Sequence, residues 1–551
     1  MKKLTLIVSA LALVMGFSQC KKDNLTPNDN RIQITLNANY GGNGSKTTFD
    51  PANGTFEWLQ GYGAEVVEYI NVGGSQSGYL GQLNNNDNKG TGTFNGSITT
   101  PQDGETLYFF YLGNGDHAGA TTLDFSNQSS GTVTDWHIAI GSADYSGTNY
   151  NVTLNMAMAI AYFDLNQFKS STDAAETVYI HGDAVYATAT INYDNGTITG
   201  NTKGFINVGT ANAGKYVALI PSVTTSTTVK FESNTKTGSM TFLRGIKPAS
   251  YYSNSGSALA PTLGILPEGA TPGLFTVAGE EVNGNKISTR MVRFSKGNLQ
   301  YHAEQNKWQF ADKQYNIIGS YNANVSSSYN GWIDLFGWGT SGWDNGNEHY
   351  QPYKTAKGTE TYGYGYGPKV KSGYTYSTQY SIVGDYSEAD WGVHNVIGND
   401  AKGTWRTPTG GTNGEFNYII NNRSTDNRFV ESTIDGKLGV ILLPDSYTHP
   451  EGITAFDKIN MTSNFWATNT YNADAWTSIE AAGAVFLPWT GQLDQGSYNS
   501  GSTYNLYWSS IHSSNKNAYT FNLGSSTVSS TDSNSSYRYK GNAVRLVYDV
   551  Q

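Results

Sequence analysis

Side chains that could bind a ligand are concentrated in one segment of the chain, between Trp338 and Tyr386. Within it, Trp343 stands close to Asp344, Asn347 and Glu348, so an aromatic ring is followed by clustered carboxylate and amide oxygens. Aromatic rings can stack on sugar rings while such oxygens bond hydroxyl groups. The oxygens could also hold calcium, but a turn built from Asp, Asn and Gly is the explanation that we favour for this cluster.

Tyrosine alternates with glycine further along the same segment, at Tyr362, Tyr364 and Tyr366. Tyrosine gives rigid contact area with a polar edge, and a long loop without a strand pattern is often functional. The predicted ligand-binding residues are Trp343, Asp344, Asn347, Glu348, Tyr362, Tyr364 and Tyr366. The alternative, that these rings pack the loop against its own domain, stays open at this point.

No catalytic motif accompanies these residues. The histidines of this half of the chain are scattered: His302, His349, His394, His449 and His512. The sequence contains no Gly-x-Ser-x-Gly motif, no phosphate-binding loop and no His-Glu-x-x-His motif. We therefore predict no catalytic residues, no metal and no cofactor, and we rank an uncharacterised enzyme as the third hypothesis.

The single cysteine of the chain, Cys20, closes an export signal. Two lysines precede an apolar run from Leu4 to Phe17, which is shorter than the roughly 18 residues that a membrane-spanning helix needs. With its terminal cysteine, this segment resembles a bacterial lipoprotein signal, which implies cleavage before Cys20 and acylation of its thiol. We expect a signal peptide over 1–19, a tether over 20–30, and a surface-exposed lipoprotein of the outer membrane. An ordinary signal peptide with an incidental cysteine is the alternative.

The composition favours strands and argues against a nucleic-acid partner. Of 551 residues, 14% are charged and 13% aromatic, and the net charge is −10. Many Tyr and Thr with few Lys and Glu favour β-structure. A mildly acidic chain lacks the basic face that a nucleic acid requires, so we predict no nucleic-acid partner.

The first 252 residues carry the alternation of short strands. Residues 107–112 read as a strand that is buried on both sides, and residues 152–162 as one strand with a face of small alanines, Ala157, Ala159 and Ala161. Asn195-Gly196 predicts a hairpin turn. We predict one β-sandwich over 31–165 and a second over 166–252, followed by a proline-containing linker over 253–273.

This half resembles the fimbrillin-like proteins, the two-sandwich subunits of lipoprotein-derived pili. The matching segments are residues 56–66, 156–161, 214–221 and 245–252. The resemblance implies that other pilin subunits are partners and that a protease can cut at an arginine to open a groove for a donor strand. Arg31, the only arginine before Arg244, lies at the start of the first strand, which does not match that cleavage position.

Residues 274–551 form a different kind of domain, which contains ten of the twelve tryptophans. Strand patterns are interrupted by two helix signals: a capping box from Ser387 to Asp390, and Phe416, Ile419 and Ile420 at helical spacing. The fold class that we predict for the whole chain is mainly β, with two N-terminal β-sandwiches followed by an α+β domain.

This last domain resembles the C-type-lectin-like domains related to formylglycine-generating enzymes. The resemblance rests on residues 294–301, 405–409 with 415–416, 507–510 and 541–547. Those enzymes act through reactive cysteines, and this domain has none, which excludes their activity. The segments 351–353 and 508–510 lack the oxygens with which sugar-binding lectins coordinate calcium.

Together these features predict a membrane-anchored adhesin, or a tip or accessory pilus subunit, that binds a glycan or a host or bacterial surface protein through its C-terminal domain. A structural stalk without ligand binding is the second hypothesis.

Overall fold

The computed structural model describes residues 31–550 apart from a set of gaps. The residues outside the description are 41–46, 51–54, 59–64, 73–75, 86–91, 102, 113–120, 130–135, 137, 171–174, 194, 223–225, 255–256, 280, 283–284, 288, 325, 345–351, 353–380, 495, 501–504, 515 and 525–526. The predicted signal peptide, the tether and Cys20 therefore lie outside the described residues. Among the described residues, no helix is long and apolar enough to cross a bilayer.

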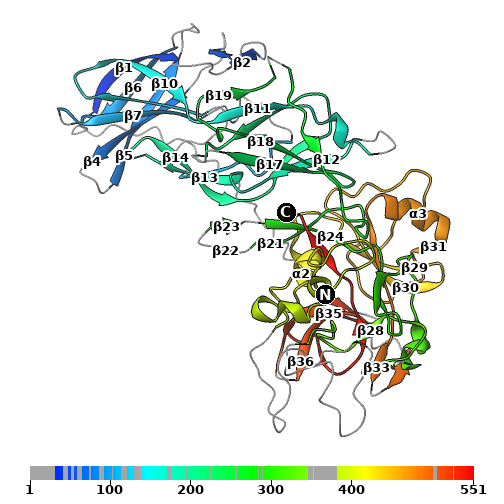
Figure 1. Cartoon of the computed structure of the whole chain (residues 1–551). Coiled ribbons are helices and arrows are strands. Elements are labelled where there is room, and N and C mark those ends of the chain that lie inside the picture. The colour runs from blue at the N-terminus through cyan, green and yellow to red at the C-terminus, as the bar shows by residue number, and fades with distance from the viewer. Residues whose placement is uncertain are drawn as a thin grey trace, which may run out of the picture.

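The fold is mainly β, as predicted (Figure 1). The first sheet closes on itself as a barrel in the order β1-β10-β9-β7-β4-β5-β6, where the sequence suggested two open sheets. Its strands are β1 (Arg31–Tyr40), β4 (Glu65–Val72), β5 (Gln76–Asn85), β6 (Gly92–Thr99), β7 (Thr106–Leu112), β9 (Ile138–Asp144) and β10 (Asn149–Met156), and a separate hairpin is formed by β2 (Thr47–Asp50) and β3 (Thr55–Trp58).

Strand β1 closes the barrel. It pairs antiparallel with β6 and parallel with β10, and the other described strand pairs of the barrel are antiparallel. Ile34 and Leu36 of β1 are buried in the barrel core beside Leu107 and Phe109. Burying two branched aliphatic side chains contributes roughly 1.5–3 kcal/mol each, so β1 is an integral part of this core.

Strand β7 is buried on both faces, as its sequence predicted. Leu107, Phe109 and Tyr111 face the barrel core, whereas Phe110 and Leu112 face a second core that belongs to the neighbouring sheets. A strand between two apolar cores needs no polar alternation, which explains its nearly continuous apolar sequence.

Three further sheets follow the barrel. Their orders are β16-β11-β19, β15-β12-β17-β18-β20 and β22-β23-β14-β13-β8. The strands are β8 (Thr122–Asp124), β11 (Ala159–Phe163), β12 (Thr177–His181), β13 (Tyr186–Asn192), β14 (Thr197–Lys203), β15 (Ile206–Thr210), β16 (Lys215–Leu219), β17 (Thr227–Glu232), β18 (Thr237–Phe242), β19 (Ser250–Tyr252), β20 (Thr262–Leu263), β22 (Glu281–Val282) and β23 (Asn285–Ile287), with a short 3-10 helix at Asn166–Phe168.

The middle sheet, β16-β11-β19, packs between two cores. Ala159 and Ala161 of β11 face Val178 and Phe231 of the β12–β17 sheet. Ile160 faces the opposite core, which the β13 and β7 strands share. The alanine face predicted from the sequence is therefore confirmed for Ala159 and Ala161, whereas Ala157 packs against the opposite core.

Two local predictions differ in outcome. The Asn195-Gly196 turn is confirmed, because Gly196 joins β13 to β14 with a φ of 64°. The single strand predicted over 152–162 is wrong: the chain leaves β10 at Met156 and starts β11 at Ala159 in another sheet. Apolar alternation continues through the break because both strands face apolar cores, so the pattern alone could not reveal it.

The C-terminal domain combines small sheets with short helices. The sheets are β21-β24-β40, β26-β25-β27, β28-β39-β35-β36-β37 with β38, β31-β29-β30-β32 and β33-β34. The strands are β21 (Phe275–Ala278), β24 (Thr289–Phe294), β25 (Leu299–His302), β26 (Lys307–Phe310), β27 (Trp332–Ile333), β28 (Leu335–Phe336), β29 (Phe429–Ile434), β30 (Lys437–Leu442), β31 (Thr470–Tyr471), β32 (Val485–Pro488), β33 (Gln492–Asp494), β34 (Ser497–Asn499), β35 (Leu506–His512), β36 (Asn517–Gly524), β37 (Thr527–Ser529), β38 (Ser535–Tyr537), β39 (Asn542–Ala543) and β40 (Val547–Asp549).

The helices correct part of the prediction. They are α1 (Trp391–His394), α2 (Glu415–Asn417), α3 (Ala473–Ala481), 3-10 helices at Gly319–Asn324 and Gly384–Ala389, and a π-helical turn at Tyr418–Asn422. The helical spacing of Phe416, Ile419 and Ile420 is confirmed, since all three are buried. Helix α3 was not predicted because its apolar stripe consists of only Trp476 and Ile479.

The capping box at Ser387 is wrong. Residues 384–389 are a 3-10 helix, and Asp390 is the residue that caps α1 by accepting from the Gly392 N–H at 2.9 Å. Its other oxygen accepts from the Thr407 N–H at 2.8 Å. Burial raises the pKa of Asp390 to about 6, against the opposing effect of these two hydrogen bonds.

The N-terminal half and the C-terminal domain lie end to end and contact where β12 and β17 approach β21 and β24 (Figure 1). Arg293, which is fully buried, donates to Glu232 at 3.1 Å and to the carbonyls of Ser233 and Asn234. Tyr179 and Phe205 pack against Leu274, Met291 and Val550. Backbone pairing of β23 with β14 adds a third contact.

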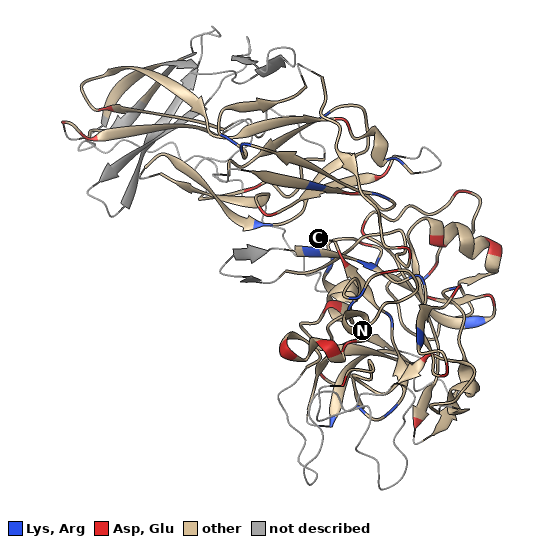
Figure 2. Cartoon of the chain, viewed as in Figure 1, with Lys and Arg blue, Asp and Glu red and all other residues tan. Residues whose placement is uncertain are grey.

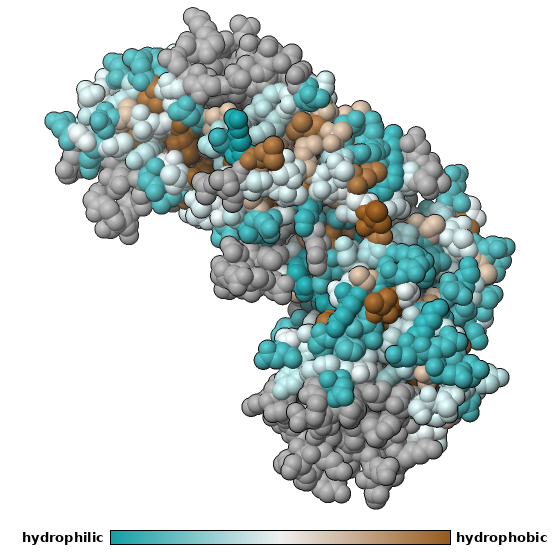
Figure 3. All heavy atoms as spheres, in the orientation of Figure 1, coloured by the Kyte–Doolittle hydropathy of each residue, from teal (hydrophilic) through white to brown (hydrophobic). Residues whose placement is uncertain are grey.

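Basic and acidic residues are sparse and interspersed along the described chain (Figure 2). Apolar residues form small separate patches on the face in view (Figure 3).

Candidate ligand-binding site

The predicted aromatic segment begins inside the core. The Trp338 side chain is fully buried, its indole N–H donates to the Ser509 carbonyl at 2.6 Å, and the Arg538 guanidinium lies 4.6 Å from its ring. Trp391, Trp405, Trp476 and Trp508 are also fully buried. The abundance of tryptophan in this domain therefore reflects its core and not an exposed aromatic surface.

Two of the predicted site residues are described. Trp343 is half-buried and packs edge-on against Tyr386, with ring centroids 6.5 Å apart. Asp344, the next residue, is exposed. Asn347, Glu348, Tyr362, Tyr364 and Tyr366 lie outside the described residues. The ligand-binding role of all seven residues stays a prediction.

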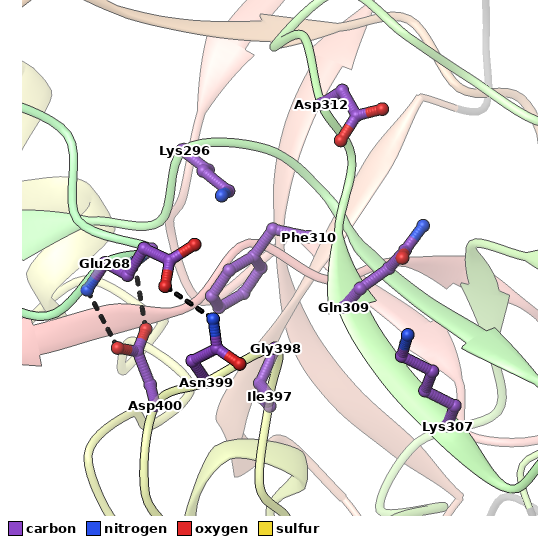
Figure 4. A pocket seen from close by; sticks show the side chains of 11 residues that line it. Glu268, Lys296, Lys307, Gln309, Phe310, Asp312, Ile397, Gly398, Asn399 and Asp400 are labelled. Atoms are coloured by element: carbon purple, nitrogen blue, oxygen red, sulfur yellow. Dashed lines mark hydrogen bonds between the residues drawn. The ribbon is translucent and has the colours of Figure 1, made fainter.

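A pocket of about 210 Å³ lies elsewhere on the same domain (Figure 4). It is built where the end of the linker meets β26 and the turn that follows α1. The lining residues are Glu268, Gly269, Lys296, Lys307, Gln309, Phe310, Asp312, Ile397, Gly398, Asn399 and Asp400.

Asp400 fastens the linker to this turn. Its carboxylate accepts from the backbone N–H groups of Glu268 at 2.8 Å and Gly269 at 2.9 Å, and from the Trp405 indole N–H at 3.0 Å. Position 269 requires glycine, because a Cβ there would lie 2.6 Å from the Phe310 ring and 2.8 Å from Asp400. The Asn399 amide donates to the Glu268 carboxylate at 2.7 Å, which adds a further hydrogen bond between the linker and this turn.

Two lysines and three carboxylates line the pocket. The carboxylates of Glu268 and Asp400 already accept hydrogen bonds, whereas Lys296 and Lys307 make no ion pair within the described part of the chain. In Figure 4 the two lysines lie on opposite sides of the Phe310 ring. The unpaired ammonium groups of the two lysines suit a ligand that carries a carboxylate. Among the described residues, Asp312 is the one lining carboxylate that accepts no hydrogen bond.

The pocket is small. Its volume is smaller than the roughly 300 Å³ at which pockets for drug-sized ligands begin, so it fits one small polar group. Among the described residues, no group of three or more His, Cys, Asp or Glu side chains could hold a metal ion.

Sequence reasoning did not single out these residues. Glu268 and Asp400 are 132 positions apart, and nothing in their spacing connects them. The available signals were only the turn sequence Gly398-Asn399-Asp400 and the prolines before Glu268.

The Trp-Arg-Thr-Pro-Thr segment builds a structural ion-pair network and not a ligand site. Arg406 donates to both oxygens of Glu415, at 2.6 and 2.7 Å, and to both oxygens of Asp549, at 2.6 and 2.7 Å. Arg290 adds a bond to Glu415 at 2.9 Å. Burial acts to raise the pKa of Glu415, but the two arginines hold it below its ordinary value.

Glu415 also holds the corner between this segment and α2. Its carboxylate accepts from the Thr409 N–H at 2.9 Å, and its own N–H donates to the Thr409 hydroxyl at 2.9 Å. This reciprocal pair satisfies two backbone donors at the start of α2. These residues, which carried part of the resemblance to lectin-like domains, therefore hold the start of α2 in place.

No protein-family model matches the chain, and no curated protein matches it. Solved structures that it is similar to include a candidate cell adhesion protein from Bacteroides uniformis, with 14% identity over 43% of this chain and 99% of that chain and a TM-score of 0.29. A fimbrial protein from Bacteroides ovatus has 11% identity over 94% of this chain and 99% of that chain, with a TM-score of 0.23. The tip fimbrial protein Mfa3 from Porphyromonas gingivalis has 8% identity over 44% of this chain and 84% of that chain, with a TM-score of 0.22. At these TM-scores the likeness identifies no equivalent residues.

Proposed function

We propose that the protein is a subunit of a surface fimbria whose C-terminal domain presents a ligand-binding surface. The observation that carries this proposal is the position of β1. It is the first strand of the barrel, it supplies Ile34 and Leu36 to the core, and it makes the parallel pair with β10. A subunit of this kind can be joined to the next when an equivalent strand of that subunit replaces β1.

Removal of β1 would leave the edges of β6 and β10 unpaired beside an open apolar groove. Such edges bind extended strands through their free backbone groups. Arg31 is the first residue of β1, so a cut after it would leave the strand in the barrel. In this protein, a strand of the next subunit would therefore enter the barrel by displacing β1, without a cut at Arg31.

A disulfide that locks β1 to β6 tests this proposal. Gln33 and Ser97 are register partners, and residues 21–551 contain no other cysteine. We expect the Gln33→Cys/Ser97→Cys protein to incorporate a labelled peptide of the Arg31–Tyr40 sequence at least tenfold more slowly than wild type, with recovery on reduction. In the producing bacterium, the locked chain should no longer copurify with pilin subunits.

The matched control is Lys230→Cys/Ser239→Cys, which locks the register partners of β17 and β18 away from the barrel. It should leave both measurements unchanged. Copurification of the locked β1 protein with pilins at the wild-type level would refute assembly through this strand.

The finer parts of the proposal concern the two ends of the chain. Acylation at Cys20 would hold the protein at the outer membrane, and several acyl chains give stable anchoring where one is marginal. The C-terminal domain, which we propose to be C-type-lectin-like, would face outward and bind a glycan or a surface protein. The free ammonium groups beside Phe310 support a glycan that carries a carboxylate.

A glycan array with the purified chain 21–551 tests ligand binding by this domain. We expect Lys296→Ala/Lys307→Ala to weaken binding of acidic glycans at least tenfold, with Lys437→Ala at the exposed β29–β30 turn as control. Retained binding would exclude the pocket. Loss in Trp343→Ala and Tyr364→Ala instead would assign the aromatic segment. The absence of any ligand would favour the structural stalk.

A further inference from the structure

We propose that the cleft between the N-terminal half and the C-terminal domain is a binding site for an uncharged saccharide. This inference does not rest on the proposed function, because the cleft is separate from the pocket of Figure 4 and from the aromatic segment. Its volume is about 660 Å³, which lies within the range of roughly 300–1,000 Å³ typical of small-molecule sites.

Both sides of the cleft are held in place. One wall comes from β12, β13 and the segment after β8, and the other from β21, β24 and residues 424–426. The buried Arg293–Glu232 ion pair joins the two sides, and Leu274 and Met291 pack against Tyr179 and Phe205. A site with fixed walls loses little conformational entropy when a ligand binds.

Two aromatic rings line the cleft. Phe205 stacks on the His181 ring with centroids 4.4 Å apart, which fixes the orientation of its ring. Tyr179 is half-buried, and burial raises the pKa of its hydroxyl above the ordinary value, so the hydroxyl remains a donor at neutral pH. Such rings offer the faces on which sugar rings stack.

Polar groups in the cleft are oriented and only partly used. Asn127 accepts from the Ser129 N–H at 3.1 Å, and Asn207 accepts from the Gly209 N–H at 2.9 Å, which leaves their NH2 groups as donors. One oxygen of Asp124 accepts from the Ser126 N–H at 2.8 Å, and the other accepts no hydrogen bond from the part of the chain that is described. The buried Thr188 hydroxyl has no hydrogen-bond partner among the described residues. Paired donors and acceptors of this kind match sugar hydroxyls.

The charges select against an anionic ligand. The charged side chains that line the cleft are Asp124, Asp426 and Asp445, and no Lys, Arg or His lines it among the described residues. Asp445 is already bound by Arg423 at 2.9 Å and by the Thr276 N–H at 2.7 Å. Repulsion by the remaining carboxylates disfavours acidic sugars. The cleft therefore differs in ligand charge from the pocket that contains Lys296 and Lys307.

Saturation-transfer NMR on the purified chain 21–551 tests the proposal with five probes: lactose, cellobiose, N,N′-diacetylchitobiose, the anionic 3′-sialyllactose and the polycation spermidine. We expect at least one neutral disaccharide to bind, and sialyllactose to bind at least tenfold more weakly. Tyr179→Ala and the milder Asp426→Asn, at an exposed position, should each weaken neutral binding about tenfold or more. Thr289→Trp, which fills the cleft, should do the same without removing a buried group.

Asp435→Asn at the β29–β30 turn is the matched control and should bind as wild type does, and a thermal melt verifies the fold of each variant. Lys296→Ala/Lys307→Ala should leave the binding of neutral disaccharides unchanged. A result against the proposed pocket site can therefore be distinguished from a result against the proposed cleft site. The proposal is overturned if no neutral probe binds at millimolar concentration, if the polycation spermidine alone binds, or if the cleft variants bind normally.

Discussion

Replacement of Glu415 by Ala is expected to destabilise the protein by about 3–5 kcal/mol, because it removes a buried carboxylate that both Arg406 and Arg290 bind and leaves their guanidinium groups to share Asp549. The Glu415 side chain is only 3% exposed, so water can replace little of the lost charge. Urea unfolding of the chain 21–551 measures the change. Glu388→Gln is the control, because its pairs with His394 and Lys402 lie at the surface and contribute under about 1 kcal/mol.

The same network sets a direction for the pH dependence. The folded-state pKa of Glu415 is lowered, so its contribution to stability is complete above the ordinary glutamate pKa of about 4.3 and is lost as pH falls through the lowered value. The difference in unfolding free energy between wild type and Glu415→Ala should therefore shrink on acidification below about pH 4. A difference that is constant down to pH 2 would contradict the assignment of this stability to the ion pairs.

Replacement of Arg293 by Met is expected to have the second large effect, on the junction between the N-terminal half and the C-terminal domain. Glu232 is 3% exposed and would be left buried without the guanidinium that neutralises it, which costs about 3–5 kcal/mol. The carbonyls of Ser233 and Asn234 would lose their donor as well. Calorimetry should show an earlier transition, and protease cleavage within 253–273 should become faster.

The double variant Arg293→Met/Glu232→Leu distinguishes a buried charge from lost packing. Removal of both charges should recover most of the stability, since a buried pair is often replaceable by apolar side chains of similar volume. A double variant as unstable as Arg293→Met would show that the backbone hydrogen bonds, and not the unpaired carboxylate, dominate this junction.

The sequence allowed prediction of features that depend on one strand and its immediate faces. The two apolar faces of β7, the small alanines of β11 and the Asn195-Gly196 turn are all local patterns with one physical explanation. They were predictable because residue size and backbone freedom at those positions directly restrict the structure.

Features that depend on distant segments were not predictable. The change of sheet between β10 and β11 leaves the apolar alternation intact. Asp390, not Ser387, caps α1 because the Thr407 N–H on another segment shares its carboxylate. The pocket requires Glu268 and Asp400 to meet across 132 positions, and the cleft requires the contacts that join the two halves, such as the Arg293–Glu232 ion pair.

The middle sheet β16-β11-β19 has a consequence for how such proteins can be recombined. Its three strands come from both sides of position 165, and each of its faces completes a different core. If the chain were divided at that position, for example by exchange of a domain between genes, β11 would lose its pairing with β16 and β19. Both hydrophobic cores that this sheet completes would then lack part of their side chains. Diversification by exchange of whole segments is therefore disfavoured within the first 250 residues, and variation there must accumulate at the loops.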